Sequence, residues 1–327
     1  MAKQRLGSSR RFLGALGFLL GTSVFALSCQ SAPKVSEPPP TPEPVKAEAV
    51  RPEPFQAKST VKSDPVFDIT LSSDKVADGS IVVVGLHPLM EIDVAGVTVK
   101  FEGKEFPVFP AGPAKDLEAL VVIPFNSKPR RTKIELAWSG GRADVPIEVI
   151  DGNYPSEKLT VDEKKVNPPK KVMKRIIREV KEIGKLYRKI DQERYWSGPF
   201  ALPIDSEVTS RFGNKRLFNG SMKSFHQGLD LRARTPTPIH APEGARVVLA
   251  KDLYFTGNTV ILDHGYGLFT IYGHMSRIDV KVGDKVAKGQ VMGLSGMSGR
   301  ASGPHLHWGA VLMHQKFNPA DLTKVPR

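Results

Sequence analysis

Short apolar runs alternate with polar and turn-forming residues from Val66 to Val149, where glycine, proline, aspartate and asparagine separate the runs at nearly regular intervals. Seven such runs in a segment of this length predict a small β-sandwich of an immunoglobulin-like kind, which we assign to residues 66–155. The segment lacks the Cys–Trp–Cys signature of antibody domains, so the pattern predicts only the architecture. The predicted strands are FDITLS, SIVVVGL, IDVAGVTVKF, EFPVFP, LEALVVIPF, TKIELAW and VPIEVI.

The period of the apolar residues changes in the next segment, residues 156–199, which we assign as a linker. Residues 170–190 contain no proline, and their apolar residues recur at steps of three and four, which predicts an amphipathic helix that begins after Pro169. The apolar stripe consists of Val172, Ile176, Val180, Ile183 and Tyr187. The other face is basic, with Lys170, Lys171, Lys174, Arg175, Arg178, Lys181, Lys185, Arg188 and Lys189. A charged helix face is usually solvated; the alternative is a patch that binds polyanions or anionic lipid head groups.

Short apolar runs return in residues 200–327, now broken by many glycines that allow tight reversals of the chain. This pattern predicts a second, glycine-rich, all-β domain over residues 200–327. The three segments together predict a mainly β protein, in which one helix connects an N-terminal sandwich to the C-terminal β domain.

The N-terminal residues, 1–29, have the features of an export signal. Basic residues precede an apolar stretch of seventeen residues, 12–28, which is short for a membrane span. The only cysteine of the chain, Cys29, follows this stretch, and FALSC resembles a bacterial lipobox, in which the cysteine is lipidated. We therefore expect a periplasmic lipoprotein held at a membrane by Cys29. The outer membrane is preferred because Gln30, and not aspartate, comes next. An ordinary secretory signal that is cleaved nearby is the alternative.

Residues 30–65 are rich in proline and almost free of large apolar side chains, which predicts a disordered, extended tether. The formal net charge of the whole chain is +13. An exported basic protein is attracted to anionic polymers of the cell envelope, and nucleic acid is not an expected partner. No pattern in the chain predicts an oligomeric state.

Seven of the eight histidines lie after residue 225. His226 and Asp230 are four residues apart in FHQGLD, His274 lies in YGHMS, and His305 and His307 are two apart in GPHLHWG. Residues two apart on a strand point to the same face, so His305 and His307 can face one cleft. Zinc prefers imidazole and carboxylate ligands, and a catalytic zinc uses three protein ligands and a water. The cluster therefore predicts the site of a zinc hydrolase.

The motifs TSRFG, HQGLDLRA, YGHMS and GPHLHWG stand in this order, and residues 200–319 resemble the lysostaphin-type, or LytM-like, zinc metallopeptidases that cut peptidoglycan cross-bridges. The resemblance implies that Zn²⁺ is bound by His226, Asp230 and His307. It also implies that His274 and His305 are catalytic. Many members have HLHFE where this chain has HLHWG; the difference follows the ligand, so we expect it to affect substrate fit more than metal binding.

The resemblance implies a zinc endopeptidase that hydrolyses peptide cross-links of bacterial peptidoglycan. His305 is the expected general base because it shares a face with His307, and His274 is the expected donor to the oxyanion. The alternative is a non-catalytic peptidoglycan-binding protein or a regulator of a cell-wall amidase. Some LytM-like proteins have that role, generally after losing ligands, whereas this chain keeps all of them. We expect the N-terminal β domain to position the enzyme or to limit access to its cleft.

Overall fold

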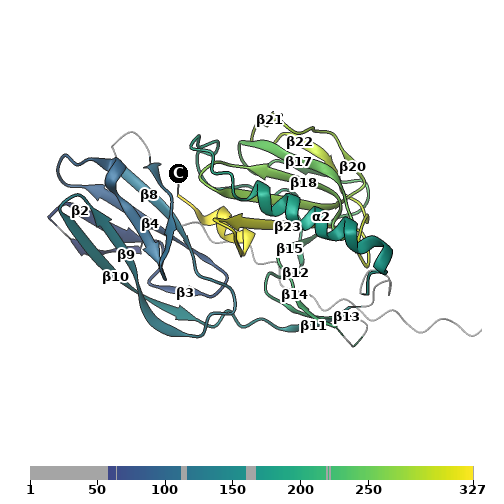
Figure 1. The fold of residues 1–327 in the computed structure, drawn as a ribbon, viewed down its shortest axis with the longest axis horizontal. Coiled ribbons are helices and arrows are strands. Elements are labelled where there is room, and N and C mark those ends of the chain that lie inside the picture. The colour runs from purple at the N-terminus through teal and green to yellow at the C-terminus, as the bar shows by residue number, and fades with distance from the viewer. Residues whose placement is uncertain are drawn as a thin grey trace, which may run out of the picture. The chain divides into compact units, whose positions relative to one another are not determined.

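The structure, a computed structural model, describes residues 58–63, 65–111, 116–159, 167–218, 220 and 222–326. The predicted signal with Cys29, and the predicted tether up to residue 57, lie outside these residues. Residues 46–327 form one compact unit. The architecture is mainly β, as predicted, with several sheets and one α-helix in the part that is described (Figure 1). None of the described helices has the length and apolar character needed to cross a membrane.

Two five-stranded sheets form from the first part of the chain. Their strands are β1 (Lys58–Ser63), β2 (Phe67–Leu71), β3 (Lys75–Ala77), β4 (Ile81–Pro88), β5 (Thr98–Phe101), β6 (Lys104–Phe106), β7 (Val108–Ala111), β8 (Asp116–Val122), β9 (Arg130–Trp138) and β10 (Gly141–Ile150), with a short 3-10 helix, η1 (Val94–Gly96). The strand order is β1-β2-β4-β8-β7 in one sheet and β3-β10-β9-β5-β6 in the other. Along much of β9 and β10, buried residues alternate with exposed ones, because successive side chains point to opposite faces of a sheet.

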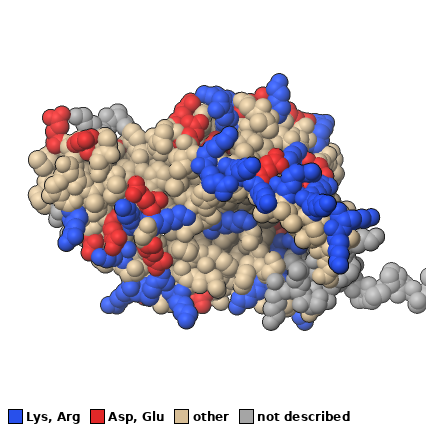
Figure 2. All heavy atoms as spheres, in the orientation of Figure 1, with Lys and Arg blue, Asp and Glu red and all other residues tan. Residues whose placement is uncertain are grey.

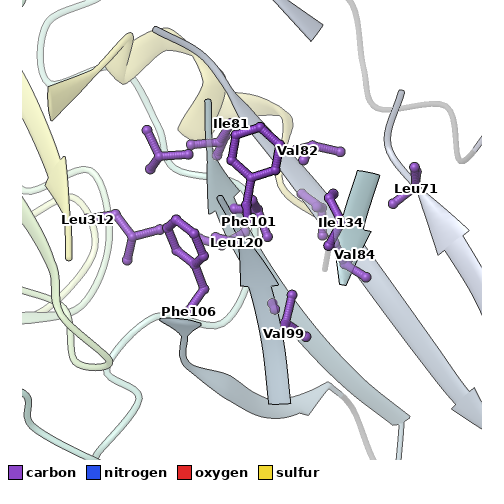
Figure 3. Packing of buried hydrophobic residues seen from close by; sticks show 14 of the residues in the cluster. Leu71, Ile81, Val82, Val84, Val99, Phe101, Phe106, Leu120, Ile134 and Leu312 are labelled. Atoms are coloured by element: carbon purple, nitrogen blue, oxygen red, sulfur yellow. The ribbon is translucent and has the colours of Figure 1, made fainter. Parts of the chain in front are cut away.

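One hydrophobic cluster is made by buried side chains from both of these sheets. Figure 3 shows Phe101, Phe106, Leu120 and Ile134 within it. The cluster also contains Leu312 from the C-terminal part of the chain, which Figure 3 shows near Phe106. The core of the first two sheets is therefore continuous with buried residues that follow the predicted metal ligands in the sequence.

β1 differs from the prediction, because it lies in the segment assigned to the disordered tether. It pairs antiparallel with β2, with Ser63 opposite Asp68. Pro54 and Pro65 are the prolines on either side of this stretch, and none lies between them. The backbone N–H groups of residues 58–63 are therefore free to join a ladder, which proline would prevent. The structure thus has a strand at residues 58–63, within the range that the sequence assigns to the tether.

The connecting helix, α2 (Lys170–Leu186), is shorter than predicted. Val180, which we placed in the apolar stripe, is 63% exposed, and the inward position belongs to Glu179, which is 7% exposed. Burial of a carboxylate requires partners. Glu179 accepts the backbone N–H of Tyr254 at 2.9 Å and pairs with Arg175 at 2.6 Å. Lysine and arginine side chains gather over α2 in Figure 2, in agreement with the basic face that the sequence predicts.

The remaining strands form three further sheets. They are β11 (Ser156–Leu159), β12 (Val208–Ser210), β13 (Lys215–Phe218), β14 (Met222–Phe225), β15 (Leu229–Arg232), β16 (Pro238–His240), β17 (Ala245–Leu253), β18 (Gly257–Asp263), β19 (Leu268–Met275), β20 (Arg277–Ile278), β21 (Lys285–Val286), β22 (Val291–Leu294), β23 (His305–Leu312) and β24 (Gln315–Phe317). The largest sheet has the order β12-β15-β23-β19-β18-β17-β21, and β24 also pairs with β23. A small sheet joins β11, β13 and β14, and another joins β16, β22 and β20.

The C-terminal end of the chain packs into the cluster shared with the first two sheets. Phe317 and Leu322, the latter in the 3-10 helix η2 (Pro319–Lys324), are both fully buried there, and Trp196 from the segment after α2 joins them. The carboxylate of Asp321 accepts the backbone N–H of Ile81 at 3.3 Å. The largest sheet is therefore supported by the first two sheets and not only by its own core.

Candidate metal centre

Neighbouring strands and one loop bring together the five residues singled out in the sequence. Asp230 lies on β15, directly opposite His307 on β23. His305 begins β23, and His274 lies on β19, the neighbour of β23 on the other side. His226 follows the end of β14 and precedes β15. Strand β23 therefore lies between β15, which carries Asp230, and β19, which carries His274. The spacing of neighbouring strands sets the distance between these two residues.

Three ligand atoms converge to the distances that one bound ion requires. His226 Nε2 lies 3.0 Å from Asp230 Oδ1 and 3.1 Å from His307 Nδ1. His307 Nδ1 lies 2.9 Å from Asp230 Oδ1. The three residues form a group of potential metal ligands. Two imidazole nitrogens and one carboxylate oxygen are the donor set that catalytic zinc sites use, so the residues present fit zinc.

The protonation states of this group also suit a metal. Burial disfavours the charged carboxylate, but His226 and His307 outweigh it and hold the pKa of Asp230 well below its usual range. Burial lowers the pKa of His307 to about 4, although Asp230 opposes the shift. At neutral pH the carboxylate is therefore ionised and the His307 ring is neutral. These are the forms that bind zinc.

Three further residues contact the ligands His226 and Asp230: Arg211 through its backbone, and Ser210 and Arg216 through their side chains. Ser210 and Arg211 belong to the TSRFG motif, but the sequence assigned no role to them. His226 Nδ1 lies 2.9 Å from the carbonyl oxygen of Arg211 and 2.9 Å from Ser210 Oγ. Arg216 donates to Asp230 Oδ2 at 2.5 Å. This bond occupies the carboxylate oxygen that does not face the two histidines, and it leaves Oδ1 for the ion.

His274 and His305 lie beside the ligand group with their rings 4.7 Å apart, centroid to centroid. His274 Nδ1 lies 2.7 Å from the carbonyl oxygen of Ser298, and His305 Nδ1 lies 2.8 Å from that of Gly303. A carbonyl oxygen only accepts, so each Nδ1 carries a hydrogen and Nε2 is the ring nitrogen that can accept a proton. Burial lowers the pKa of His274 to about 3, and the neighbouring His305 and His307 act in the same direction.

Two residues that the sequence placed outside the chemistry lie in the core. Trp308, which distinguishes HLHWG from the HLHFE of many LytM-like members, is fully buried. The departure from the usual motif therefore alters packing within the sheet. His264 is also fully buried; its Nδ1 donates to the carbonyl oxygen of Gly244 at 2.8 Å, and its Nε2 lies 2.8 Å from Thr270 Oγ1.

Comparison with known proteins places the same segment in a family. The model of peptidase family M23 matches residues 224–319, which include all five residues of the site. A crystal structure of a peptidase assigned to M23 from Pseudomonas aeruginosa is similar over most of the chain. It is 30% identical in sequence, the TM-score is 0.58, and the similarity covers 76% of this chain and 94% of that chain.

Two curated relatives are similar over the C-terminal part. Peptidoglycan DD-endopeptidase ShyA of Vibrio cholerae is 36% identical over 119 residues, which cover 36% of this chain and 28% of ShyA. DD-carboxypeptidase/endopeptidase Mpg of Neisseria meningitidis is 34% identical over 98 residues, which cover 30% of this chain and 23% of Mpg. The chain therefore matches less than a third of the length of either relative.

Proposed function

Because the chain belongs to peptidase family M23, we propose that it is a zinc-dependent endopeptidase that hydrolyses peptide cross-links of bacterial peptidoglycan. One observation carries the proposal: the ligand atoms of His226, Asp230 and His307 converge within 3.1 Å of one another, beside two further histidines. The substrate class is that of the relatives named peptidoglycan DD-endopeptidase.

Each of the five residues has a defined role in this proposal. His226, Asp230 and His307 hold the zinc, which when bound polarises the scissile carbonyl and lowers the pKa of a water. His305 accepts the proton of the attacking water at Nε2, since its Nδ1 is engaged by the carbonyl oxygen of Gly303. His274 also presents an accepting Nε2 while its ring is neutral, so it accepts a hydrogen bond from the attacking water and orients it. The proton that His305 takes from this water passes to the nitrogen of the leaving amine, so His274 does not become the oxyanion donor expected from the sequence.

The competing role, a non-catalytic wall-binding protein or an amidase regulator, is less well supported. A regulator has no need of a complete ligand set or of two histidines with accepting nitrogens beside it. Here the three ligands are buried or nearly so, and both neighbouring rings are held by carbonyl oxygens at 2.7–2.8 Å. Such orientation is expected of groups that transfer protons.

The proposal is tested with purified cell-wall sacculi and a soluble form of the chain that begins at Lys46, the start of the compact unit. We expect zinc-dependent loss of cross-linked muropeptide dimers, identified by mass spectrometry. The variant His307→Ala should be inactive, and His314→Ala, which changes an exposed histidine, should remain active. Binding of one zinc per chain without any release of muropeptides would contradict the endopeptidase.

Three further features belong to the same proposal. An enzyme that acts on the cell wall works outside the cytoplasm, and we infer export by the predicted signal and lipidation at Cys29. Mass spectrometry of the native protein should find a lipid-modified N-terminal cysteine; an unmodified N-terminus would contradict the anchor.

We also infer that the two N-terminal sheets form an immunoglobulin-like sandwich, supported by their shared core.

A further inference from the structure

A strand from the predicted linker contributes a side chain to the surroundings of the metal centre. β11 adds to β13 in parallel, with Glu157 opposite Arg216. It lies outside the segment that the family model matches, residues 224–319, and outside the domain that we assigned from the sequence. The Glu157 side chain is 22% exposed, and that of Arg216 is 17% exposed. The carboxylate is therefore partly shielded from water.

The carboxylate of Glu157 contacts three residues that surround the ligands. Oε2 accepts the hydroxyl hydrogen of Ser210 at 2.9 Å. Oε1 accepts the side-chain amide of Asn214. The guanidinium of Arg216 approaches to 3.6 Å through its Nε, a distance that gives electrostatic attraction but no hydrogen bond.

Each of these residues in turn touches a metal ligand. Ser210 Oγ lies 2.9 Å from His226 Nδ1. The backbone oxygen of Asn214 accepts the N–H of His226 at 2.9 Å. Arg216 reaches both Ser210 Oγ, at 3.0 Å, and Asp230 Oδ2, at 2.5 Å. One carboxylate thus reaches two of the three ligands, each through a single intermediate residue.

We propose that Glu157 is a positioning residue of the metal centre. An ionised carboxylate only accepts, so the Ser210 hydroxyl must donate to it and can only accept from His226 Nδ1. The Ser210 hydroxyl thus adds to the carbonyl oxygen of Arg211, 2.9 Å from the same nitrogen, in keeping the hydrogen of His226 on Nδ1 and the Nε2 lone pair directed to the ion. The negative charge also holds Arg216 against Asp230 Oδ2, which keeps Oδ1 turned toward the histidines. Outer partners of this kind orient and tune metal ligands.

The inference rests on the zinc site of the proposed function but not on the cleavage reaction, so zinc affinity is the measurement. It is determined by competition with a chromophoric chelator on the chain from Lys46 onward, without substrate. Glu157→Ala should weaken zinc binding by about 10- to 100-fold, the range found for outer-shell partners. Lys158→Ala changes the exposed neighbour on the same strand and should bind zinc as the unaltered chain does.

Two further variants separate positioning from mere support of the fold. Glu157→Gln keeps an oxygen for the Ser210 hydroxyl but removes the charge that attracts Arg216, so it should recover part of the affinity lost in Glu157→Ala. If Glu157 acts through Ser210, the double variant Glu157→Ala/Ser210→Ala should lose little more than the more affected single variant, because coupled residues are not additive. The Co²⁺ absorption spectrum should change in Glu157→Ala, since the ligand geometry changes, and circular dichroism verifies that each variant is folded.

Unchanged zinc affinity in a folded Glu157→Ala variant would overturn the inference, as would an equal loss in Lys158→Ala. Additive losses in the double variant would overturn the route through Ser210. A chain that binds zinc as expected but releases no muropeptides would contradict only the proposed function and leave these affinities to be judged on their own.

Discussion

The buried imidazole of His264 makes the stability of the protein depend on pH in a way that one substitution isolates. Burial lowers its pKa to about 4, from an ordinary value of 6.5. The unfolded chain therefore binds a proton at this residue in a pH range where the folded chain does not. The contribution of His264 to stability is complete above pH 6.5 and is lost as the pH falls toward 4.

The expected magnitude follows from these two pKa values. Between pH 7 and pH 5, linkage gives a loss of about 2 kcal/mol in the free energy of unfolding from His264 alone. His264→Asn removes the titrating group and keeps an amide that can donate to the carbonyl oxygen of Gly244. The variant is expected to be less stable at pH 7, because the contact with Thr270 is lost. Its stability should nevertheless fall by about 2 kcal/mol less than that of the unaltered chain over the same pH interval.

Denaturant unfolding at pH 7 and pH 5, on metal-free protein, measures this difference. The other buried histidines titrate in both chains, so their contributions cancel. His314→Asn is the matched control: His314 is exposed and has a φ of +67°, a backbone conformation that asparagine tolerates. Burial and the nearby Lys104 and Arg188 also lower the pKa of His314, so this control should lose slightly less stability than the unaltered chain but clearly more than His264→Asn. If His264→Asn loses as much stability as the unaltered chain, the ring is not held neutral and the reasoning from burial is refuted.

Three further substitutions test packing. Gly228→Ala puts a Cβ 2.5 Å from the backbone oxygen of Trp308 and 2.6 Å from His307 Cε1, so zinc affinity should fall by about tenfold or more as that ligand shifts; unchanged affinity would contradict the close approach. Gly184→Ala lies within α2, and no atom lies within 4 Å of the new Cβ. The variant should raise the free energy of unfolding by about 0.5–1 kcal/mol in the same denaturant assay, because alanine favours the helix more than glycine does. A lower free energy of unfolding would show that the added methyl group is not accommodated. Phe317→Ala removes a fully buried ring and should cost about 3–5 kcal/mol; a cost below about 1 kcal/mol would show that the shared core is not well packed.

The candidate residues were predictable because they fall in short motifs, and the ligand set followed from the resemblance that these motifs carry, although His226 and His307 are 81 positions apart. His305 and His307 alternate with Leu306, which is fully buried, as an extended strand requires. His226 and Asp230 are brought together in a different way. Asp230 lies on β15, but His226 precedes that strand, and its backbone N–H is bonded to Asn214. The loop, and not a shared strand face, brings its ring to the carboxylate.

The residues that the sequence did not reveal act over long separations or against their usual preferences. Glu157 and Ser210 are 53 positions apart, and no periodic pattern connects a short strand in a linker to the short strand β12 beyond the helix. Glu179 shows the second difficulty. The helical periodicity places Val180 inward and Glu179 outward. In the structure the Glu179 carboxylate points inward, because it accepts the backbone N–H of Tyr254 and pairs with the guanidinium of Arg175. Partners supplied by tertiary structure decide such positions.

The family segment and the functional unit of this protein differ in extent. The family model ends at residue 319, yet Leu322 and Val325 beyond it are buried in the cluster shared with the sandwich. At the other side, Glu157 approaches the metal ligands from a strand that precedes α2. Cutting the chain to residues 200–327 would therefore expose apolar surface and remove the partner of Ser210 in one step. If such a fragment were less active, the exposed apolar surface or the missing Glu157 could be the cause, so the result would not show that the N-terminal part activates the enzyme. If the fragment were more active, the gain would have occurred in spite of both losses. Point substitutions at Glu157 and at the shared core distinguish these effects, because each changes one of them and leaves the rest of the chain in place.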